Sequence, residues 1–171
     1  GADSRQLVEF ALMGAAMARA LFGVEKPTIG LLNIGVEEVK GLDEIRKAAG
    51  VLKDAPIPIR YHGFVEGDDV GRGAVDVVVT DGFTGNIALK TMEGVASFAG
   101  AVLKDAFQKN LSTRVGYLLS RGSLREAYRR LDYAEYGGAP LIGLDGVAII
   151  AHGGSNALAI KNAIRAAANA V

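Results

Sequence analysis

The stretch from residue 74 to residue 90 constrains the fold of this chain more than any other. Its first part, Val75 to Thr80, is a short β-branched run, long enough for one buried strand. A glycine-containing segment, 81–85, follows, and from Met92 to Phe107 apolar residues recur at the i, i+3, i+4 spacing of one helix face. Strand, glycine turn and helix in this order can point free N–H groups at a bound anion, although an ordinary βα turn that binds nothing has the same pattern.

The rest of the chain continues this alternation of strands and helices. Further strands are predicted at residues 28–34, 59–65 and 147–151. The first helix is expected to begin at Asp3 or Ser4 and to end near Gly23, and residues 66–69 are expected to form a turn. Strands joined by helices favour a sheet covered on both faces. We therefore predict an α/β fold, three-layer with a largely parallel sheet, in a single domain over residues 1–171.

Composition excludes several classes of function. The formal net charge is 0, so no overall positive field would recruit nucleic acid. The chain has no Cys, which excludes disulfides, thiolate zinc sites and a Cys nucleophile. No run of eighteen apolar residues is present, and the first residues lack the basic start and apolar core of a signal peptide, so neither a membrane-spanning helix nor a signal peptide is expected. We expect a cytoplasmic protein without a metal site.

Three polar loops follow predicted strands, at residues 33–41, 81–86 and 152–156. In open α/β sheets, ligands bind at the edge where the strands end. The loops carry Asn, Glu, Lys, Asp, Thr, His and Ser, which suit the binding of phosphate and the polarisation of a carbonyl group. Neither the phosphate-binding lysine loop of nucleotide hydrolases nor the dinucleotide glycine pattern is present. We predict a ligand site at this edge.

Single residues in these loops also have plainer interpretations. Lys40 can be an ordinary solvated lysine, and His152 can be a structural histidine bonded to backbone. Asp81 is expected to cap or brace the glycine turn. A nucleophilic pair of Ser155 with His152 is disfavoured, because the two residues lie in one turn and no nucleophile elbow is present.

The region from about residue 110 to 134 is predicted to be a helical hairpin insertion. Leu118 and Leu119 belong to an apolar stripe, and Ser123 begins a capping box that would open a second short helix. Arg121, Arg125 and Arg129 are spaced four residues apart along it. The hairpin can be an ordinary surface element packed on its own core, or an apolar and basic surface that docks on an anionic membrane or an acidic protein.

Several spaced motifs, taken together, resemble one known family. They are Leu31 to Gly35 with Glu38 to Gly41, Val65 to Asp69, Thr80 to Asn86 with Leu89 to Thr91, Tyr136 to Ala139, and Ala151 to Asn156. In this order they resemble the phosphate acyltransferases of bacterial phospholipid synthesis (PlsX-type), over essentially the whole chain. Members of that family are longer, and this chain resembles their carboxyl-terminal half.

The resemblance implies an activity, partners and a fold. These enzymes convert acyl carrier protein thioesters and inorganic phosphate into acyl phosphates without a cofactor. They are cytoplasmic homodimers that associate peripherally with the membrane. Their fold is similar to the isocitrate/isopropylmalate dehydrogenases and the phosphotransacetylases. Two alternatives stay open: a phosphotransacetylase-like enzyme that uses acyl-CoA, and a non-catalytic half-chain that acts as a dimerisation or docking module.

The resemblance also assigns roles to individual residues. It implies that Lys40 and Asn86 are catalytic, with Lys40 holding phosphate and Asn86 donating a hydrogen bond to the acyl carbonyl oxygen. The residues implied to contact phosphate or the rest of the substrate are Gly82, Thr84, Gly85, Lys90, His152, Ser155 and Asn156. Leu118, Leu119, Arg121, Arg125 and Arg129 would form the docking surface for membrane or carrier protein.

Overall fold

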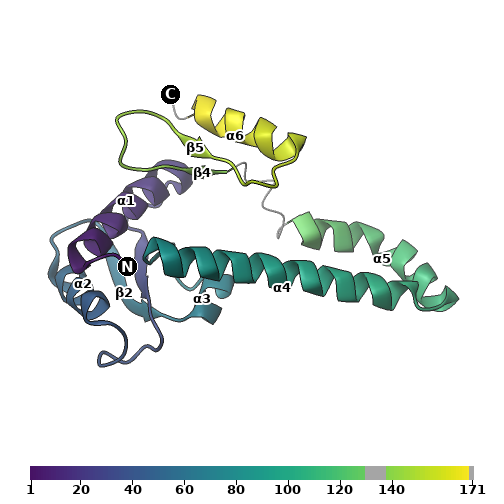
Figure 1. The fold of residues 1–171 in the computed structure, drawn as a ribbon, viewed down its shortest axis with the longest axis horizontal. Helices are drawn as coiled ribbons and strands as arrows, with labels where there is room; N and C mark the ends of the chain where they lie inside the picture. The colour runs from purple at the N-terminus through teal and green to yellow at the C-terminus, as the bar shows by residue number, and fades with distance from the viewer. Residues whose placement is uncertain (130–137, 170–171) are drawn as a thin grey trace. The chain divides into compact units, whose positions relative to one another are not determined.

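The structure is a computed structural model of the 171-residue chain, and it describes residues 1–129 and 138–169 (Figure 1). Its contacts divide the chain into two compact units, Gly1–Met92 and Glu93–Val171. The single domain over residues 1–171, with its helical hairpin at about 110–134, stays a prediction.

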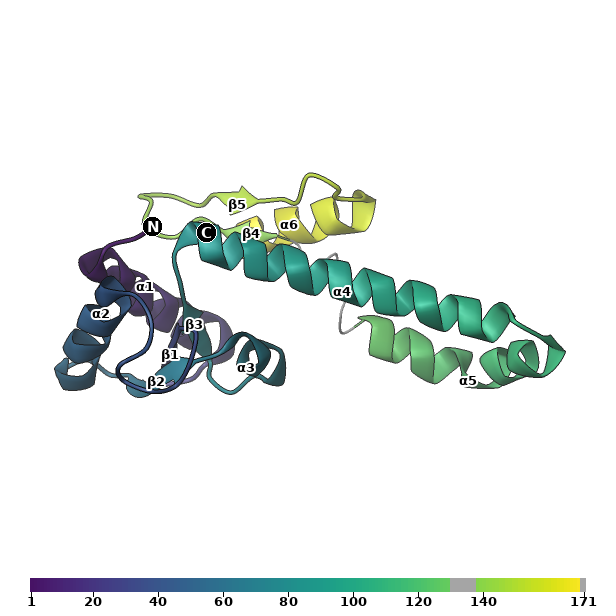
Figure 2. The same ribbon diagram turned by 60° about the horizontal axis from the view of Figure 1, so that its bottom comes forward.

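A parallel sheet of three strands forms the centre of the first unit. The strands are β1 (Thr28–Leu32), β2 (Arg60–Val65) and β3 (Val77–Val79), in the order β2-β1-β3. In the register Leu32 lies opposite Val65, and Leu31 lies opposite Val79. All three carboxyl ends therefore lie at one edge of the sheet (Figure 2). The predicted α/β fold with a parallel sheet is confirmed, with each strand shorter than predicted.

Local signals in the sequence set the ends of the first helix. The helices of this unit are α1 (Ser4–Phe22), α2 (Asp43–Asp54) and α3 (Gly67–Arg72). Asp3 caps α1 by accepting a hydrogen bond from the Gln6 N–H, and Gly23 ends it with φ of 67°. The turn predicted at residues 66–69 is wrong, because Glu66 instead caps the short helix α3.

Helices α1 and α2 bury one face of the sheet. Aliphatic and aromatic side chains from all five elements meet there, namely Leu7, Ala11, Ala15, Ile29, Leu31, Ala48, Leu52, Phe64 and Val79. Helix α1 lies close to β3, because a Cβ on Gly14 would come within 2.7 Å of Val77 Cγ1. This core fixes the sheet and thus the positions from which the loops at its carboxyl edge begin.

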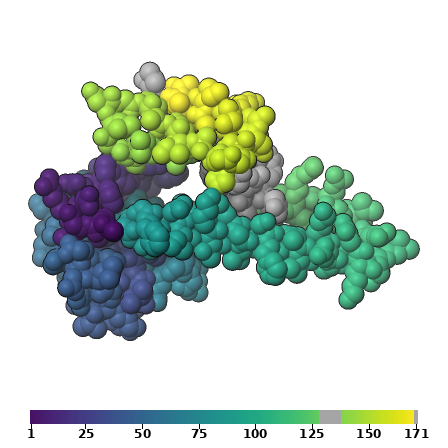
Figure 3. Space-filling model, viewed as in Figure 1, coloured from purple at the N-terminus to yellow at the C-terminus, as the bar shows by residue number. Residues whose placement is uncertain are grey.

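Helix α4 (Gly82–Gln108) begins in the first unit and continues into the second. Helix α5 (Leu111–Arg129) follows it, and the two helices are the teal and green spheres of Figure 3. The rings of Phe107 and Tyr117 contact each other at a centroid distance of 5.6 Å. The remaining elements are β4 (Ala139–Pro140), β5 (Ile149–Ile150) and α6 (Ala157–Asn169). The strand predicted at 147–151 was expected in the parallel sheet, but its central residues form β5, which pairs antiparallel with β4.

Helix α5 differs from the prediction in one respect. The capping box expected at Ser123 does not open a new helix, because α5 is continuous through this position. In mid-helix the N–H groups that a capping residue would satisfy are bonded within the helix. The helix start is capped by Asn110, whose Oδ1 accepts hydrogen bonds from the Thr113 N–H at 2.9 Å and the Ser112 hydroxyl at 2.7 Å. Among the described residues, no helix is long and apolar enough to cross a bilayer.

Candidate functional site

Two polar segments leave the parallel sheet at the same edge. The β1–α2 loop, which contains Lys40, follows Leu32, and the β3–α4 junction, which leads to Asn86, follows Val79. Strands β1 and β3 are hydrogen-bonded neighbours, so both segments start side by side. Lys40 and Asn86 are both exposed to solvent. That their side chains converge on one ligand stays a prediction.

Lys40 is held by an ion pair within its own loop. Its Nζ lies 2.8 Å from Oε1 of Glu37, and its backbone N–H donates to the Glu37 carbonyl at 3.0 Å. The hydrogen bond that Lys40 Nζ donates to the Glu37 carboxylate raises the pKa of Lys40 above its ordinary value and lowers the pKa of Glu37. The lysine stem lies across Gly35, since a Cβ there would come within 2.5 Å of Lys40 Cδ. The loop therefore presents a protonated amine at the sheet edge.

Asn33 is hydrogen-bonded to both ends of this loop. It follows β1 directly, is 8% exposed, and its backbone N–H donates to Val65 O at 2.9 Å. Its side-chain Nδ2 donates to the carbonyl oxygens of Gly35 and Lys40, each at 3.1 Å. Its Oδ1 is buried without a hydrogen-bond partner. Asn33 thus anchors the loop through the donor end of its amide.

Asp81, which was expected to cap or brace a glycine turn, caps the first turn of helix α4. Its Oδ1 accepts hydrogen bonds from the N–H groups of Phe83 at 3.0 Å and Thr84 at 3.1 Å, and its Oδ2 accepts from the Thr84 hydroxyl at 2.6 Å. The Thr84 hydroxyl, followed by the Thr84 N–H, lowers the pKa of Asp81. The helix already begins at Gly82, so the predicted glycine turn over 81–85 is instead the first turn of α4.

The residues predicted to bind phosphate in this turn have local contacts of their own. The Gly85 N–H donates to the Asp81 carbonyl at 2.9 Å, and a Cβ on Gly85 would come within 2.9 Å of Thr80 Cγ2. Gly85 therefore serves the close approach of helix and strand. Gly82 and Lys90 are exposed near the start of the same helix. The contacts of Gly82, Thr84, Gly85 and Lys90 with phosphate stay predictions.

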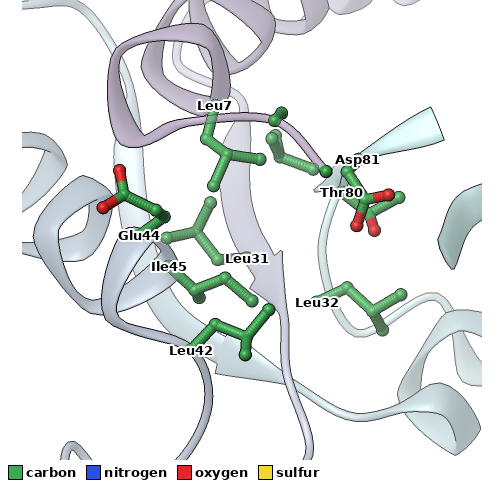
Figure 4. Close-up of a pocket in the computed structure, with 11 residues that line it drawn as sticks. Leu7, Leu31, Leu32, Leu42, Glu44, Ile45, Thr80 and Asp81 are labelled. Carbon is green, nitrogen blue, oxygen red and sulfur yellow. The ribbon is translucent and has the colours of Figure 1, made fainter. Parts of the chain in front are cut away.

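A small pocket opens at the carboxyl edge of β1 and β3 (Figure 4). Its volume is about 280 Å³. The lining is mostly aliphatic, with Glu44, Thr80 and Asp81 as its polar side chains, and the labelled aliphatic residues are Leu7, Leu31, Leu32, Leu42 and Ile45. Leu42 lies two residues beyond Lys40 in the chain, so the pocket and the Lys40 loop adjoin at this edge.

The turn after β5 belongs to the second unit. The Ser155 hydroxyl donates to the backbone carbonyl of His152 at 2.6 Å and does not bond to the imidazole ring. His152 Nδ1 accepts the Gly154 N–H at 3.1 Å, and His152 Nε2 lies 3.6 Å from Glu93 Oε2. Asn156 caps α6 by accepting the Ala159 N–H at 2.9 Å. These contacts agree with the plainer interpretation of His152, and the substrate contacts of His152, Ser155 and Asn156 stay predictions.

The predicted docking surface lies on α5. Leu118 and Leu119 are 66% and 85% exposed, and Arg121 and Arg125 are exposed as well. The side chain of Arg129 lies outside the described residues. Within residues 1–129 and 138–169, no three His, Cys, Asp or Glu side chains are grouped so that they could hold a metal ion.

Two residues of the site were not singled out from the sequence, namely Asn33 and Glu37. The signal for Asn33 is present in retrospect. An amide residue directly after an apolar strand, ahead of two loop glycines, is placed to hydrogen-bond the backbone of the loop that follows. Nothing in the sequence distinguishes Glu37 from Glu38 as the partner of Lys40.

Comparison with known proteins places the chain in a family. The model of the family described as fatty acid synthesis protein matches residues 1–171. The chain is 52% identical over 165 residues to phosphate acyltransferases of Brucella canis and Brucella abortus (strain 2308), and 51% identical to that of Brucella melitensis biotype 2. Each match covers 96% of this chain and 48% of the relative, so the chain spans about half the length of the curated relatives it matches. The chain therefore belongs to the family of fatty acid synthesis proteins, and the resemblance inferred from its spaced motifs is confirmed.

Proposed function

We propose that this chain forms part of a phosphate acyltransferase, which transfers an acyl group from acyl carrier protein to inorganic phosphate in phospholipid synthesis. The observation that carries the proposal is the 52% identity to phosphate acyltransferases over 96% of the chain. The geometry of the sheet edge supports it. A protonated lysine and an exposed asparagine follow two neighbouring parallel strands, where α/β proteins bind ligands.

The proposed reaction needs orientation more than acid–base catalysis. A phosphate oxygen attacks the thioester carbonyl carbon, a C–O bond forms, and the C–S bond breaks to release the carrier thiolate. Lys40 holds the phosphate as a point charge, and Asn86 donates its amide N–H to the carbonyl oxygen as negative charge develops. One such donor typically lowers the barrier by about 3 kcal/mol. The thiol has a pKa of only about 8.5, so it leaves with little acid assistance.

Phosphate can bind Lys40 by displacing the Glu37 carboxylate from their ion pair. Glu37 Oε1 lies 2.8 Å from Lys40 Nζ in this structure, and both side chains are about half exposed. An exposed pair of this kind contributes little to stability. A phosphate dianion can therefore replace the carboxylate at small cost, and Lys40 stays charged throughout.

The aliphatic pocket beside the loop supports an acyl substrate. Leu32, Leu42 and Ile45 line it at the edge of the sheet. Burying each CH₂ group of an acyl chain contributes about 0.8 kcal/mol, so a chain of several carbons gains affinity there. A pocket that bound only phosphate would have no use for this lining.

We also propose the finer features that the family resemblance implies. The segment of about 110–134, whose residues 111–129 form the single helix α5, is an insertion in a single α/β domain. Its exposed Leu118, Leu119, Arg121 and Arg125 dock on the membrane surface or on acyl carrier protein. The protein is a homodimer in the cytoplasm, associated peripherally with the membrane, and it binds no nucleic acid. The mixed apolar and basic surface of α5 supports this docking role.

One alternative function is supported by a specific observation. Because the chain spans about half the length of its relatives, it can act as a non-catalytic module for dimerisation or docking. The two functions differ in a direct assay. The chain alone, and a fusion of it to the part of the Brucella canis relative that the match does not cover, are incubated with phosphate and either acyl carrier protein thioester or acyl-CoA.

Acyl phosphate is measured in each reaction. Formation by the fusion from the carrier-protein thioester supports the proposal. Formation from acyl-CoA alone would favour the phosphotransacetylase-like alternative. No product from a folded fusion would leave the docking module as the function of this chain.

A further inference from the structure

We propose that Asn33 is a positioning residue, which sets the place of Lys40 in the phosphate site without touching the substrate. The inference rests on the proposed function, because it assigns Lys40 to phosphate. It concerns a residue that the family resemblance did not single out. Its basis is the set of contacts that Asn33 makes with the loop between β1 and α2.

The backbone and side chain of Asn33 are both fixed. The backbone N–H continues the ladder between β1 and β2 by donating to Val65 O at 2.9 Å. The residue is 8% exposed, and its side-chain Nδ2 donates to Gly35 O and to Lys40 O at 3.1 Å each. One amide group therefore ties the first and last turns of the loop to the end of a core strand.

The orientation of this amide follows from its partners. Both partners are carbonyl oxygens, so only the NH₂ end of the side chain can face them. Serine would retain a single donor, and alanine would retain none. The loop therefore depends on the two donors of an asparagine at this position.

Two glycines show how closely the loop is fitted to these side chains. A Cβ on Gly41, whose φ is +89°, would come within 1.9 Å of Asn33 Oδ1. A Cβ on Gly35 would come within 2.5 Å of Lys40 Cδ. The loop thus leaves room for the Asn33 amide on one side and for the Lys40 stem on the other.

The Oδ1 of Asn33 is buried without a hydrogen-bond partner. A buried acceptor without a partner is unfavourable for folding. Local costs of this kind are expected where function requires a defined geometry.

The test uses the fusion protein, with steady-state kinetics in phosphate and in acyl carrier protein thioester. We expect Asn33→Ala to lower kcat/KM for phosphate by roughly tenfold or more, since small displacements of a binding group have effects of this order. The KM for the thioester should stay within twofold. Ala15→Gly weakens the same core from α1, outside the loop, and it should leave both constants of the folded enzyme unchanged.

A double-mutant cycle tests whether Asn33→Ala affects the use of phosphate by displacing Lys40. In a Lys40→Ala background, Asn33→Ala should have little further effect on phosphate use, because the group that it positions is gone. Fully additive losses would overturn the inference, and so would a phosphate kcat/KM within twofold of wild type. If Asn33→Ala does not fold, Asn33→Ser, which keeps one donor, is measured in the same way.

Failure of the proposed function is distinguishable from failure of this inference. If the wild-type fusion makes no acyl phosphate, the activity proposal falls, and NMR titration of the fusion with inorganic phosphate decides the role of Asn33. A Lys40 signal that shifts with phosphate in wild type, and needs roughly tenfold more phosphate in Asn33→Ala, supports it. Equal titrations, or no shift in wild type, overturn it.

Discussion

Asn33 and Gly41 are in such close contact that a Cβ added to Gly41 would lie 1.9 Å from Asn33 Oδ1. Moving Asn33 aside would break hydrogen bonds, because its Nδ2 donates to two carbonyl oxygens of the same loop. Gly41 also has a φ of +89°, a conformation that residues with a side chain rarely adopt. The end of the Lys40 loop is therefore restricted to glycine for two separate reasons.

The first prediction distinguishes the effect of the close contact with Asn33 from the effect of the positive φ at Gly41. Gly41→Ala should lower the free energy of unfolding by more than Gly23→Ala does. Gly23 also has a positive φ, of 67°, but no atom lies within 4 Å of its added Cβ. Gly23→Ala is expected to cost about 1 kcal/mol from backbone conformation alone, and Gly41→Ala about 1 to 3 kcal/mol more from overpacking. Denaturant unfolding of both variants measures the difference, and equal losses would contradict the close contact.

Much of the first unit could be predicted from local sequence. Asp3 and Gly23 mark the ends of α1 because capping depends on a few adjacent residues. The three parallel strands were recognisable as β-branched or apolar runs between turns. The pairing of β5 with β4 was not, because two residues such as Ile149 and Ile150 carry no signal for which strand they will join. Ser123 illustrates a local signal that a continuous helix overrides.

The position of the candidate site at the edge of the sheet was predictable from the sequence, but the hydrogen bonds within it were not. Loops at the ends of neighbouring strands meet at one edge, so the segments carrying Lys40 and Asn86 could be assigned there. The pairing of Lys40 with Glu37, and the anchoring of the loop by Asn33, depend on how one loop folds back on itself. Hydrogen bonds of this kind are set by backbone geometry, which residue types alone do not determine.

A second prediction concerns acid sensitivity and Glu44. Hydrogen bonds from Lys47 and then from the Ser4 N–H lower the pKa of Glu44 from 4.5 to about 2. The folded state therefore binds a proton less readily than the unfolded state does. The stability from these contacts is fully present above pH 4.5 and is lost as the pH falls from 4.5 toward 2.

Glu44→Gln removes this titration. The difference in unfolding free energy between wild type and Glu44→Gln should shrink as the pH falls below 4.5, and denaturant unfolding at several pH values measures it. Glu25→Gln makes the same change of charge in the exposed segment between α1 and β1 and serves as the control. A difference that is constant across this range would show that Glu44 does not titrate with folding.

A third prediction tests the docking surface on α5. Arg121→Glu combined with Arg125→Glu should reduce binding to anionic liposomes, because each basic residue near an anionic membrane contributes about 1 kcal/mol. Co-sedimentation at low and moderate salt is the measurement. Arg5→Glu combined with Lys26→Glu, in the first unit, changes the net charge equally and is expected to leave binding unchanged. Equal sedimentation of the α5 variant and wild type, with an unchanged KM for carrier protein, would remove the docking role.

The fourth prediction concerns Lys40 and Asn86 in the fusion with the uncovered part of the Brucella relative. Asn86→Ala should lower kcat by about 10²- to 10³-fold if its amide stabilises the developing oxyanion. Lys40→Ala should impair the use of phosphate, through a higher KM or a lower kcat, because a fixed positive charge is lost. Neither change should lower the melting temperature much, since both side chains are exposed. Lys26→Ala, at another exposed lysine of the same unit, is the control.

The two variants should also differ from each other. Raising the phosphate concentration should restore turnover to Lys40→Ala to the extent that the lost charge served binding, but it cannot restore a missing hydrogen bond to the carbonyl oxygen in Asn86→Ala. Steady-state kinetics with phosphate varied, together with thermal melts, make this comparison. Near-wild-type turnover in both variants would remove the catalytic assignment, while the family membership, which rests on the whole sequence, would stand.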